Sequence, residues 1–221
     1  MDSGGPDSPT RYIIFDLDGV LVDSMRVARE AFRIAYAEVV GDGEAPFEEY
    51  SRHPGRYFPD VMGIMGLPVT MQEPFVRESY RLAGQVRPYE GVVEMLREVR
   101  ARGTRLAVAT GKSGPRARSL LSGLGLLDHF DHVVGSDEVA HGKPAPDIVL
   151  RALELWGITS REAVMIGDAE TDLASARAAG VGAIAALWGE TPAERLIAAG
   201  PDAVLYQPAD VLSLVPVSHV R

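Results

Sequence analysis

Apolar residues recur along the chain in two patterns. After residue 88, short runs of apolar residues alternate with longer segments in which apolar positions lie three or four residues apart. The short runs predict buried strands, and the wider spacing predicts amphipathic helices. The predicted strands are 105–109, 132–135, 163–167 and 182–186, and the predicted helices are 90–102, 114–124, 145–156 and 171–179. Strands that alternate with helices in this way predict an α/β fold with a doubly wound parallel sheet.

The first part of the chain contributes one more strand and then a helical pattern only. Residues 11–16, RYIIFD, are rich in β-branched and aromatic side chains and predict a strand that is buried on both faces. Residues 24–87 contain only predicted helices, at 24–40, 57–66 and 70–83. The simplest architecture is a discontinuous α/β core, 11–23 and 88–221, with a small helical cap domain inserted at 24–87.

Acidic side chains follow the first strand at the edge where a parallel sheet binds its ligands. Asp16 and Asp18 are two positions apart in an extended segment, so their side chains point the same way. Two converging carboxylates are costly without a cation, and oxygen ligands of this kind suit Mg²⁺ together with a substrate phosphate. Gly19 lets the backbone turn tightly beside the ligand. The alternative is a turn with two solvated acids.

A second polar group follows the strand at 105–109. The hydroxyl group of Thr110 and the backbone N–H groups of Gly111 and Lys112 could hold phosphate oxygens. A nucleotide-binding P-loop is excluded, because its first glycine would fall on Leu106 inside the strand. The alternative is an ordinary strand-to-helix turn that Thr110 caps.

Two further segments complete the candidate site. Lys143 in HGKPAPD, residues 141–147, could neutralise phosphate and a nucleophile, although an exposed loop lysine is the alternative. Asp168 ends the strand at 163–167, and Asp172 lies in the first turn of the next helix, where a capping role competes with a role in the site. Together the four segments predict a Mg²⁺-bound phosphate, a carboxylate nucleophile and a second acid/base.

Composition narrows the class of partner. The 221 residues are 46% hydrophobic and 24% charged, which is typical of a globular protein, and no apolar run is long enough to span a membrane. The chain has no cysteine, which excludes disulfides and thiol nucleophiles and fits a cytoplasmic protein. The net charge of −9 argues against nucleic acid as a partner.

Residues 1–10 are polar and rich in Gly and Pro, and we expect a disordered leader. The oligomeric state is left open.

The four motifs resemble those of the haloacid dehalogenase superfamily, in its branch with a small helical cap after the first strand. They are DLDGV at 16–20, Thr110, Lys143 and GDAETD at 167–172, in the family's order. The resemblance implies a Rossmann-like core, a phosphate-ester substrate and Mg²⁺. It makes Asp16 the nucleophile that forms an aspartyl-phosphate, and Lys143 the cation that offsets negative charge around Asp16.

The resemblance also assigns the remaining acids and the hydroxyl. Asp18 would be general acid and then general base, and would bind the metal through its backbone carbonyl. Thr110 would bind the phosphoryl group, Asp168 would complete the metal site, and Asp172 would lie just outside the metal ligands. Asp16 must be ionised to attack, which Mg²⁺ and Lys143 favour, and Asp18 must hold a proton, which a neighbouring anion favours.

The resemblance leaves two reactions open. The acid at position 18 favours phosphate esters over the halide and phosphonate substrates of other branches. A β-phosphoglucomutase-like sugar phosphomutase is the alternative to a phosphatase. Such mutases usually carry Glu where this chain has Gly167, and often carry His in the first cap helix near Val27 and Ala28. Both departures favour a phosphatase.

The cap is expected to select the substrate. In SRHPGRYFPD, residues 51–60, Arg52 and Arg56 could bind a substrate carboxylate or a second phosphate, with His53 and Tyr57 beside them. A solvated turn is the alternative reading of this loop. Arg116 and Arg118 are expected on the exposed face of a helix, outside the site. The likeness is to phosphoglycolate phosphatases, and more weakly to phosphatases that accompany 3-amino-5-hydroxybenzoate biosynthesis.

Overall fold

The computed structural model describes residues 11–215 and contains a six-stranded parallel sheet. The strand order is β5-β4-β1-β6-β7-β8, and each strand runs parallel to its neighbour. The strands are β1 (Tyr12–Phe15), β4 (Arg105–Thr110), β5 (His132–Gly135), β6 (Ala163–Gly167), β7 (Gly182–Ala186) and β8 (Ala203–Leu205). The predicted doubly wound α/β fold is confirmed, and five of these strands lie where the sequence predicts them.

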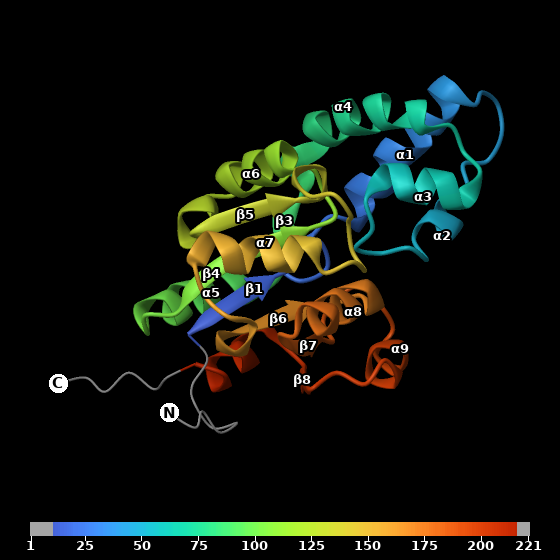
Figure 1. Cartoon of the computed structure of the whole chain (residues 1–221). Coiled ribbons are helices and arrows are strands. Elements are labelled where there is room, and N and C mark those ends of the chain that lie inside the picture. The colour runs from blue at the N-terminus through green and yellow to red at the C-terminus, as the bar shows by residue number, and fades with distance from the viewer. Residues whose placement is uncertain (1–10, 216–221) are drawn as a thin grey trace.

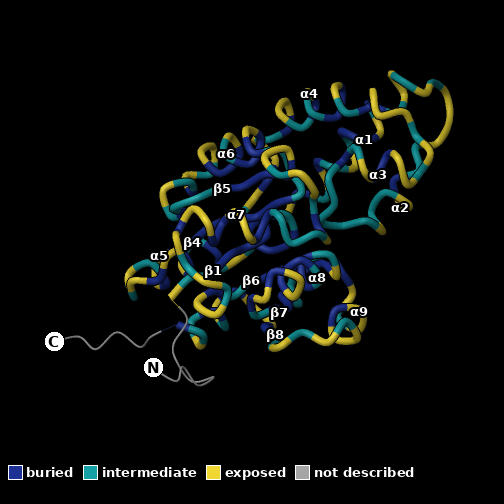
Figure 2. The backbone as a smooth tube through the Cα atoms, in the orientation of Figure 1, coloured by how far each residue is buried: buried dark blue, intermediate teal, exposed yellow. Residues whose placement is uncertain are grey.

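Side chains from successive residues of a strand enter two separate layers of the core, because neighbours along a strand point to opposite faces of the sheet. In β1, Ile13 and Phe15 belong to one buried cluster and Ile14 to the other. The first cluster is covered by α5 (Val92–Ala101) and α6 (Gly114–Gly123), and the second by α7 (Asp147–Trp156), α8 (Glu170–Ala179) and α9 (Ala193–Ala198). Figure 2 shows the strands buried between these helices. Burial on both faces explains why the strands read as continuous apolar runs.

Four helices follow β1 and pack around an apolar cluster of their own. They are α1 (Met25–Val39), α2 (Phe47–Tyr50), α3 (Phe58–Met65) and α4 (Gln72–Leu82). The rings of Phe58 and Phe75 are stacked with their centroids 4.2 Å apart, and Phe32 and Phe47 complete the aromatic centre. We call residues 25–85 the helical segment. It lies beyond the carboxyl ends of the sheet strands (Figure 1).

Two short strands connect the helical segment to the rest of the chain. β2 (Val22–Asp23) pairs antiparallel with β3 (Arg87–Pro88), so the chain enters and leaves the segment side by side. α1 begins at Met25, two residues after β2 ends at Asp23. The separate apolar cluster and this paired connection support the predicted cap domain at 24–87, which stays a prediction. The predicted leader, 1–10, lies outside the described residues.

The remaining elements are short. The 3₁₀ helices of the described residues are η1 (Val69–Met71), η2 (Ala83–Gln85), η3 (Leu127–His129), η4 (Ser136–Glu138), η5 (Ser160–Glu162) and η6 (Pro208–Ser213). Among residues 11–215, no helix combines the length and apolar character that crossing a membrane requires.

Candidate active site

The end of β1 positions the first acid. The backbone N–H of Asp16 donates to the carbonyl of Ile166 in β6 at 2.9 Å, so the sheet continues up to this residue. The chain then turns back: Leu21 N–H donates to Leu17 O at 2.9 Å, and Gly19 has φ +79°. Asp16 is buried at the carboxyl edge of the sheet and lines the pocket that separates the sheet from the helical segment.

Lys143 is the cation of the buried cluster. Its Nζ donates to Asp16 Oδ1 at 2.8 Å, to Asp172 Oδ1 at 2.5 Å and to the carbonyl of Ala109 at 3.0 Å. Three acceptors use all three donors of the ammonium group. Burial alone would lower the pKa of Lys143, but the charges of Asp16 and Asp172 outweigh it and raise that pKa. The alternative of an exposed loop lysine is therefore wrong, because the side chain is completely buried.

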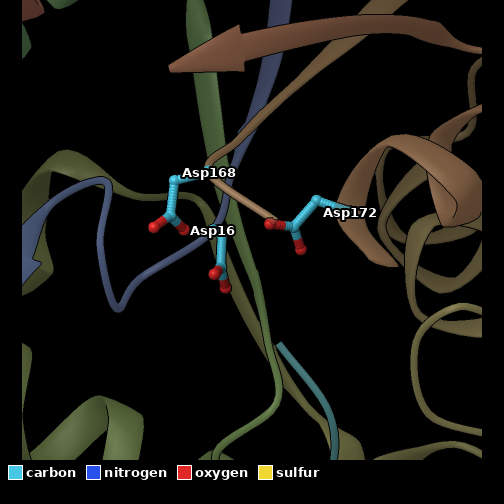
Figure 3. Close-up of side chains that lie close together, drawn as sticks. All are labelled: Asp16, Asp168 and Asp172. Carbon is cyan, nitrogen blue, oxygen red and sulfur yellow. The ribbon is translucent and has the colours of Figure 1, made fainter. Parts of the chain in front are cut away.

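Three buried acids meet beside this lysine. Asp16, Asp168 and Asp172 each offer a carboxylate oxygen, and these three oxygens lie within 4.8 Å of one another (Figure 3). Burial, followed by the charge of Asp172, raises the pKa of Asp16 to about 7 despite the opposing effect of Lys143. Burial, followed by the charges of Asp172 and Asp16, raises the pKa of Asp168 well above its usual value. One lysine does not neutralise three carboxylates, and a divalent cation would supply the missing positive charge.

The free oxygens show which acids could hold such a cation. Both oxygens of Asp172 are engaged, Oδ1 by Lys143 and Oδ2 by the backbone N–H of Ala169 at 3.0 Å. Within residues 11–215, Asp168 Oδ2 accepts only the N–H of Glu190, at 2.8 Å. Asp16 and Asp168 are therefore the candidate carboxylate ligands, and Asp172 fixes Lys143, consistent with its expected place outside the metal ligands.

Asp18 lies in the same pocket but in different electrostatic surroundings. Its carboxylate accepts from Ser24 Oγ and from Lys112 Nζ, the latter at 2.5 Å on Oδ2. Burial would raise the pKa of Asp18, but the charge and hydrogen bond of Lys112, with Ser24 and Arg116, lower it. The protein without substrate thus holds Asp18 as a carboxylate. The proton that Asp18 needs as general acid stays a prediction for the complex with substrate.

The turn after β4 carries the candidate phosphate contacts. Thr110 is buried, and its Oγ1 accepts from the backbone N–H of Lys112 at 3.1 Å. Ser136 Oγ donates to the carbonyl of Thr110 at 3.1 Å and so supports this turn from beneath. Gly111 and Lys112 line the pocket. Their roles as substrate-binding residues stay predictions, with Lys112 placed on Asp18 in the absence of substrate.

The loop between α2 and α3 reaches the sheet edge. Thr171 Oγ1 donates to the carbonyl of Pro54 at 2.8 Å, and a Cβ atom at Gly111 would lie 2.6 Å from the carbonyl oxygen of Gly55. Arg56 lines the pocket, whereas Arg52 is exposed and is not part of the pocket lining. The hydroxyl of Tyr57 accepts from Gln72 Nε2 at 3.0 Å inside the helical segment. Only Arg56 of the two predicted arginines is placed to meet a substrate.

Two charged pocket residues were not predicted from the sequence. Arg116 was expected on an exposed face of α6, but only 9% of it is accessible and it lines the pocket. The expectation was wrong because positions 116, 117, 120 and 121 form the inward stripe of α6, and an arginine on that stripe was the available signal. Glu190, after β7, also lines the pocket, and burial followed by Asp18 raises its pKa to about 7.

Comparison with known proteins places this site in a family. A model of the haloacid dehalogenase-like hydrolases matches residues 10–180, more than half of the chain. The chain is 33% identical over 216 residues to the protein named "Probable phosphatase IndB" from Dickeya dadantii, covering 87% of this chain and 88% of that protein. It is 34% identical over 196 residues to a phosphoglycolate phosphatase from Rhodospirillum rubrum, covering 81% of this chain and 80% of that protein.

The solved structures agree with this placement. A hydrolase from Pseudomonas syringae matches with a TM-score of 0.79 and 25% identity, over 91% of this chain and 96% of that chain. The chain belongs to the haloacid dehalogenase-like hydrolase family. The predicted class of enzyme, a phosphatase of this family, is confirmed by the family match and by relatives that bear that name.

Proposed function

We propose that the protein is a Mg²⁺-dependent phosphatase that hydrolyses a small phosphate monoester through an aspartyl-phosphate on Asp16. The observation that carries this proposal is the position of the Asp16 carboxylate. It lies at the pocket floor, in contact with Lys143 and beside Asp168, with Asp18 in the same pocket. A nucleophile, a charge-neutralising cation and a separate acid/base are the groups that two-step phosphate transfer requires.

Asp16 would act first. An oxygen of its carboxylate attacks phosphorus, the bond between phosphorus and the ester oxygen breaks, and the departing alcohol oxygen takes a proton from Asp18. Water then attacks the same phosphorus, its proton passes back to Asp18, and the bond to Asp16 breaks. Lys143, with its three contacts, keeps Asp16 oriented throughout. Asp16 and Asp168 would hold Mg²⁺, which when bound supplies positive charge that stabilises the phosphoryl oxygens.

Lys112 would link substrate binding to the proton on Asp18. In the free protein its ammonium group neutralises Asp18 and lowers the pKa of that carboxyl. A bound phosphate group competes for the same ammonium group and adds a negative charge nearby. Both changes raise the pKa of Asp18 and prepare it to donate the proton. Return of Lys112 to Asp18 after the alcohol leaves would favour the carboxylate again.

The phosphomutase alternative is less well supported. A side chain at Gly167, where those mutases usually carry Glu, would place its Cβ 2.2 Å from the Cβ of Asp172. Val27 and Ala28 contribute apolar surface to the pocket where such mutases often carry His. Neither position offers a second acid/base to a sugar hydroxyl. A test for isomer formation with a sugar phosphate and its bisphosphate would separate the two reactions.

The proposal is tested with Asp16→Asn and with Asp128→Asn, an exposed aspartate outside the pocket, as the matched control. With 4-nitrophenyl phosphate and Mg²⁺, we expect Asp16→Asn to lose at least about 1000-fold in kcat/KM, because no nucleophile remains. EDTA should abolish activity of the wild type, and borohydride trapping followed by peptide mass spectrometry should mark Asp16. Undiminished turnover by Asp16→Asn would contradict the proposal.

A cytoplasmic location and the absence of nucleic-acid partners stay predictions.

A further inference from the structure

Arg116 is a buried cation whose N–H groups have no hydrogen-bond partner within residues 11–215, although the charge of Asp18 acts on it. Its guanidinium group forms no ion pair or hydrogen bond within residues 11–215, although only 9% of the residue is accessible. A buried arginine is ordinarily paired, because an uncompensated charge away from water is costly. The group therefore has donors available that the fold itself does not use.

The surroundings direct this cation into the pocket. The guanidinium carbon lies 5.2 Å from the centre of the Phe75 ring in α4, so the group rests against an aromatic face. Its nitrogen atoms are not among the polar atoms that are both sealed and unpaired, which in the described chain are Thr104 Oγ1, Glu190 Oε1 and Thr191 Oγ1. The unpaired nitrogens thus keep access to the pocket that Arg116 lines.

The pocket that Arg116 lines has apolar and aromatic side chains as well as the polar groups of the candidate site. The apolar and aromatic side chains that line the pocket include Val27, Tyr50, Phe58, Phe75, Tyr80 and Leu120. The hydroxyl groups of a sugar would lose their hydrogen bonds to water against these apolar side chains. A flat apolar group has no such hydrogen bonds to lose. A carboxylate carries the charge opposite to that of a guanidinium group. It is also planar and can accept two of the guanidinium N–H groups.

We propose that the substrate is a phosphate ester of a hydroxy acid with an apolar body, and that Arg116 binds its carboxylate at the leaving-group end. This inference rests on the proposed function, because Asp16 must be the phosphate end of the same pocket. It names a substrate class and a specificity-determining residue. It also explains an arginine on the inward stripe of α6, where an apolar residue would otherwise pack.

The test compares two esters of nearly the same shape, 4-carboxyphenyl phosphate and 4-carbamoylphenyl phosphate, in which a neutral amide replaces the carboxylate. We expect the wild type to prefer the carboxylate by about 10-fold or more in kcat/KM, since charge-assisted hydrogen bonds to a buried arginine would be lost with the amide. Arg116→Gln should reduce this preference to about 1-fold, and the readout is this ratio between the two esters rather than the absolute activity of the variant. Arg118→Gln is the control on the same helix, because Arg118 pairs with Glu138 outside the pocket, and it should keep the wild-type preference.

Binding provides a second measurement that does not depend on turnover. Thermal shift with 4-hydroxybenzoate and with 4-hydroxybenzamide should show stabilisation by the acid alone in the wild type, and by neither compound in Arg116→Gln. Phosphoglycolate has the carboxylate but lacks the apolar body. The wild type should therefore hydrolyse it with a lower kcat/KM than 4-carboxyphenyl phosphate.

Three outcomes would overturn the inference: equal use of the acid and the amide by the wild type, an unchanged preference in Arg116→Gln, or a preference for phosphoglycolate. Each of them leaves the proposed function intact if 4-nitrophenyl phosphate is still hydrolysed and Asp16→Asn is inactive. Failure of the proposed function is distinguished by activity that survives Asp16→Asn.

Discussion

Asp16 lies among more negative charge than one lysine can neutralise. Lys143 is shared with Asp172, and burial and Asp172 together raise the pKa of Asp16 to about 7 in the protein without metal. An acid with a raised pKa keeps its proton to higher pH, and that proton must leave before the oxygen can bind a cation. Protons and Mg²⁺ therefore compete for Asp16.

The competition predicts a pH-dependent affinity for Mg²⁺. Below pH 7 the affinity should fall by up to about tenfold per pH unit for the proton on Asp16 alone, and the raised pKa of Asp168 adds a second proton that must leave. Titration of Mg²⁺ by isothermal calorimetry at pH 6, 7 and 8 measures this directly. Asp18→Asn should keep a pH dependence but move it to lower pH, because the charge of Asp18 contributes to the raised pKa of Asp16. Equal Mg²⁺ dissociation constants at pH 6 and pH 8 would refute the prediction.

The sequence predicted some of these residues and missed others for physical reasons. Asp16, Asp168 and Lys143 follow strands or precede a helix at the sheet edge, so element order alone brings them together, and the buried cluster of Asp16, Asp168, Asp172 and Lys143 agrees with that expectation. The partner of Lys112 could not be predicted, because its side chain joins Asp18 across 94 positions of the sequence. Arg116 was misplaced because its charge was given more weight than its position on a helical stripe.

At the scale of an element, the turn after β1 is built around close contact with Asp168. Gly19 has φ +79°, and a Cβ there would lie 2.0 Å from Asp168 Oδ2. Replacement by alanine would displace the Asp168 carboxylate as well as strain the turn. Gly103 offers a matched control, since it has φ +82° but open space around it.

We therefore expect Gly19→Ala to lose most of the stabilisation by Mg²⁺ and at least about 10-fold in kcat/KM, because Asp168 is a candidate ligand. Gly103→Ala should lower the melting temperature through backbone strain alone, with the Mg²⁺-induced shift retained. Differential scanning fluorimetry with and without Mg²⁺ separates the two effects. A full Mg²⁺-induced shift in Gly19→Ala would show that Asp168 does not hold the ion.

Element prediction succeeded where periodicity extends over several residues. The strand expected at 163–167 is β6 (Ala163–Gly167), and the helix expected at 114–124 is α6 (Gly114–Gly123). β8 (Ala203–Leu205) was missed because three residues are too few to establish a period. β2 and β3 have two residues each, and only their pairing across the chain identifies them. Short elements of this kind are specified by tertiary contacts rather than by local pattern.

Considered as a whole, the molecule closes its site by contact between the helical segment and the sheet edge. The loop at 54–56 contacts the edge at two places: Pro54 accepts from Thr171, and Gly55 and Arg56 present their carbonyl oxygens to Gly111. These contacts join residues far apart in sequence. The helical pattern at 24–87 predicted a separate unit, but not the backbone atoms on which it rests.

Gly111 tests whether this contact is required for activity. A Cβ at position 111 would lie 2.6 Å from the carbonyl oxygen of Gly55 and 2.8 Å from that of Arg56, so Gly111→Ala should prevent the loop from seating over the pocket. The expected result is a loss of about 10- to 100-fold in kcat/KM with little change in melting temperature, because misplacement at a reaction centre is costly while the two apolar cores are untouched. Gly63→Ala, in α3 with open space around it, should leave kcat/KM unchanged. If Gly111→Ala retains wild-type kcat/KM on 4-nitrophenyl phosphate, then hydrolysis does not require the loop at 54–56 to contact Gly111. The pocket would then be active with the helical segment farther from the sheet edge.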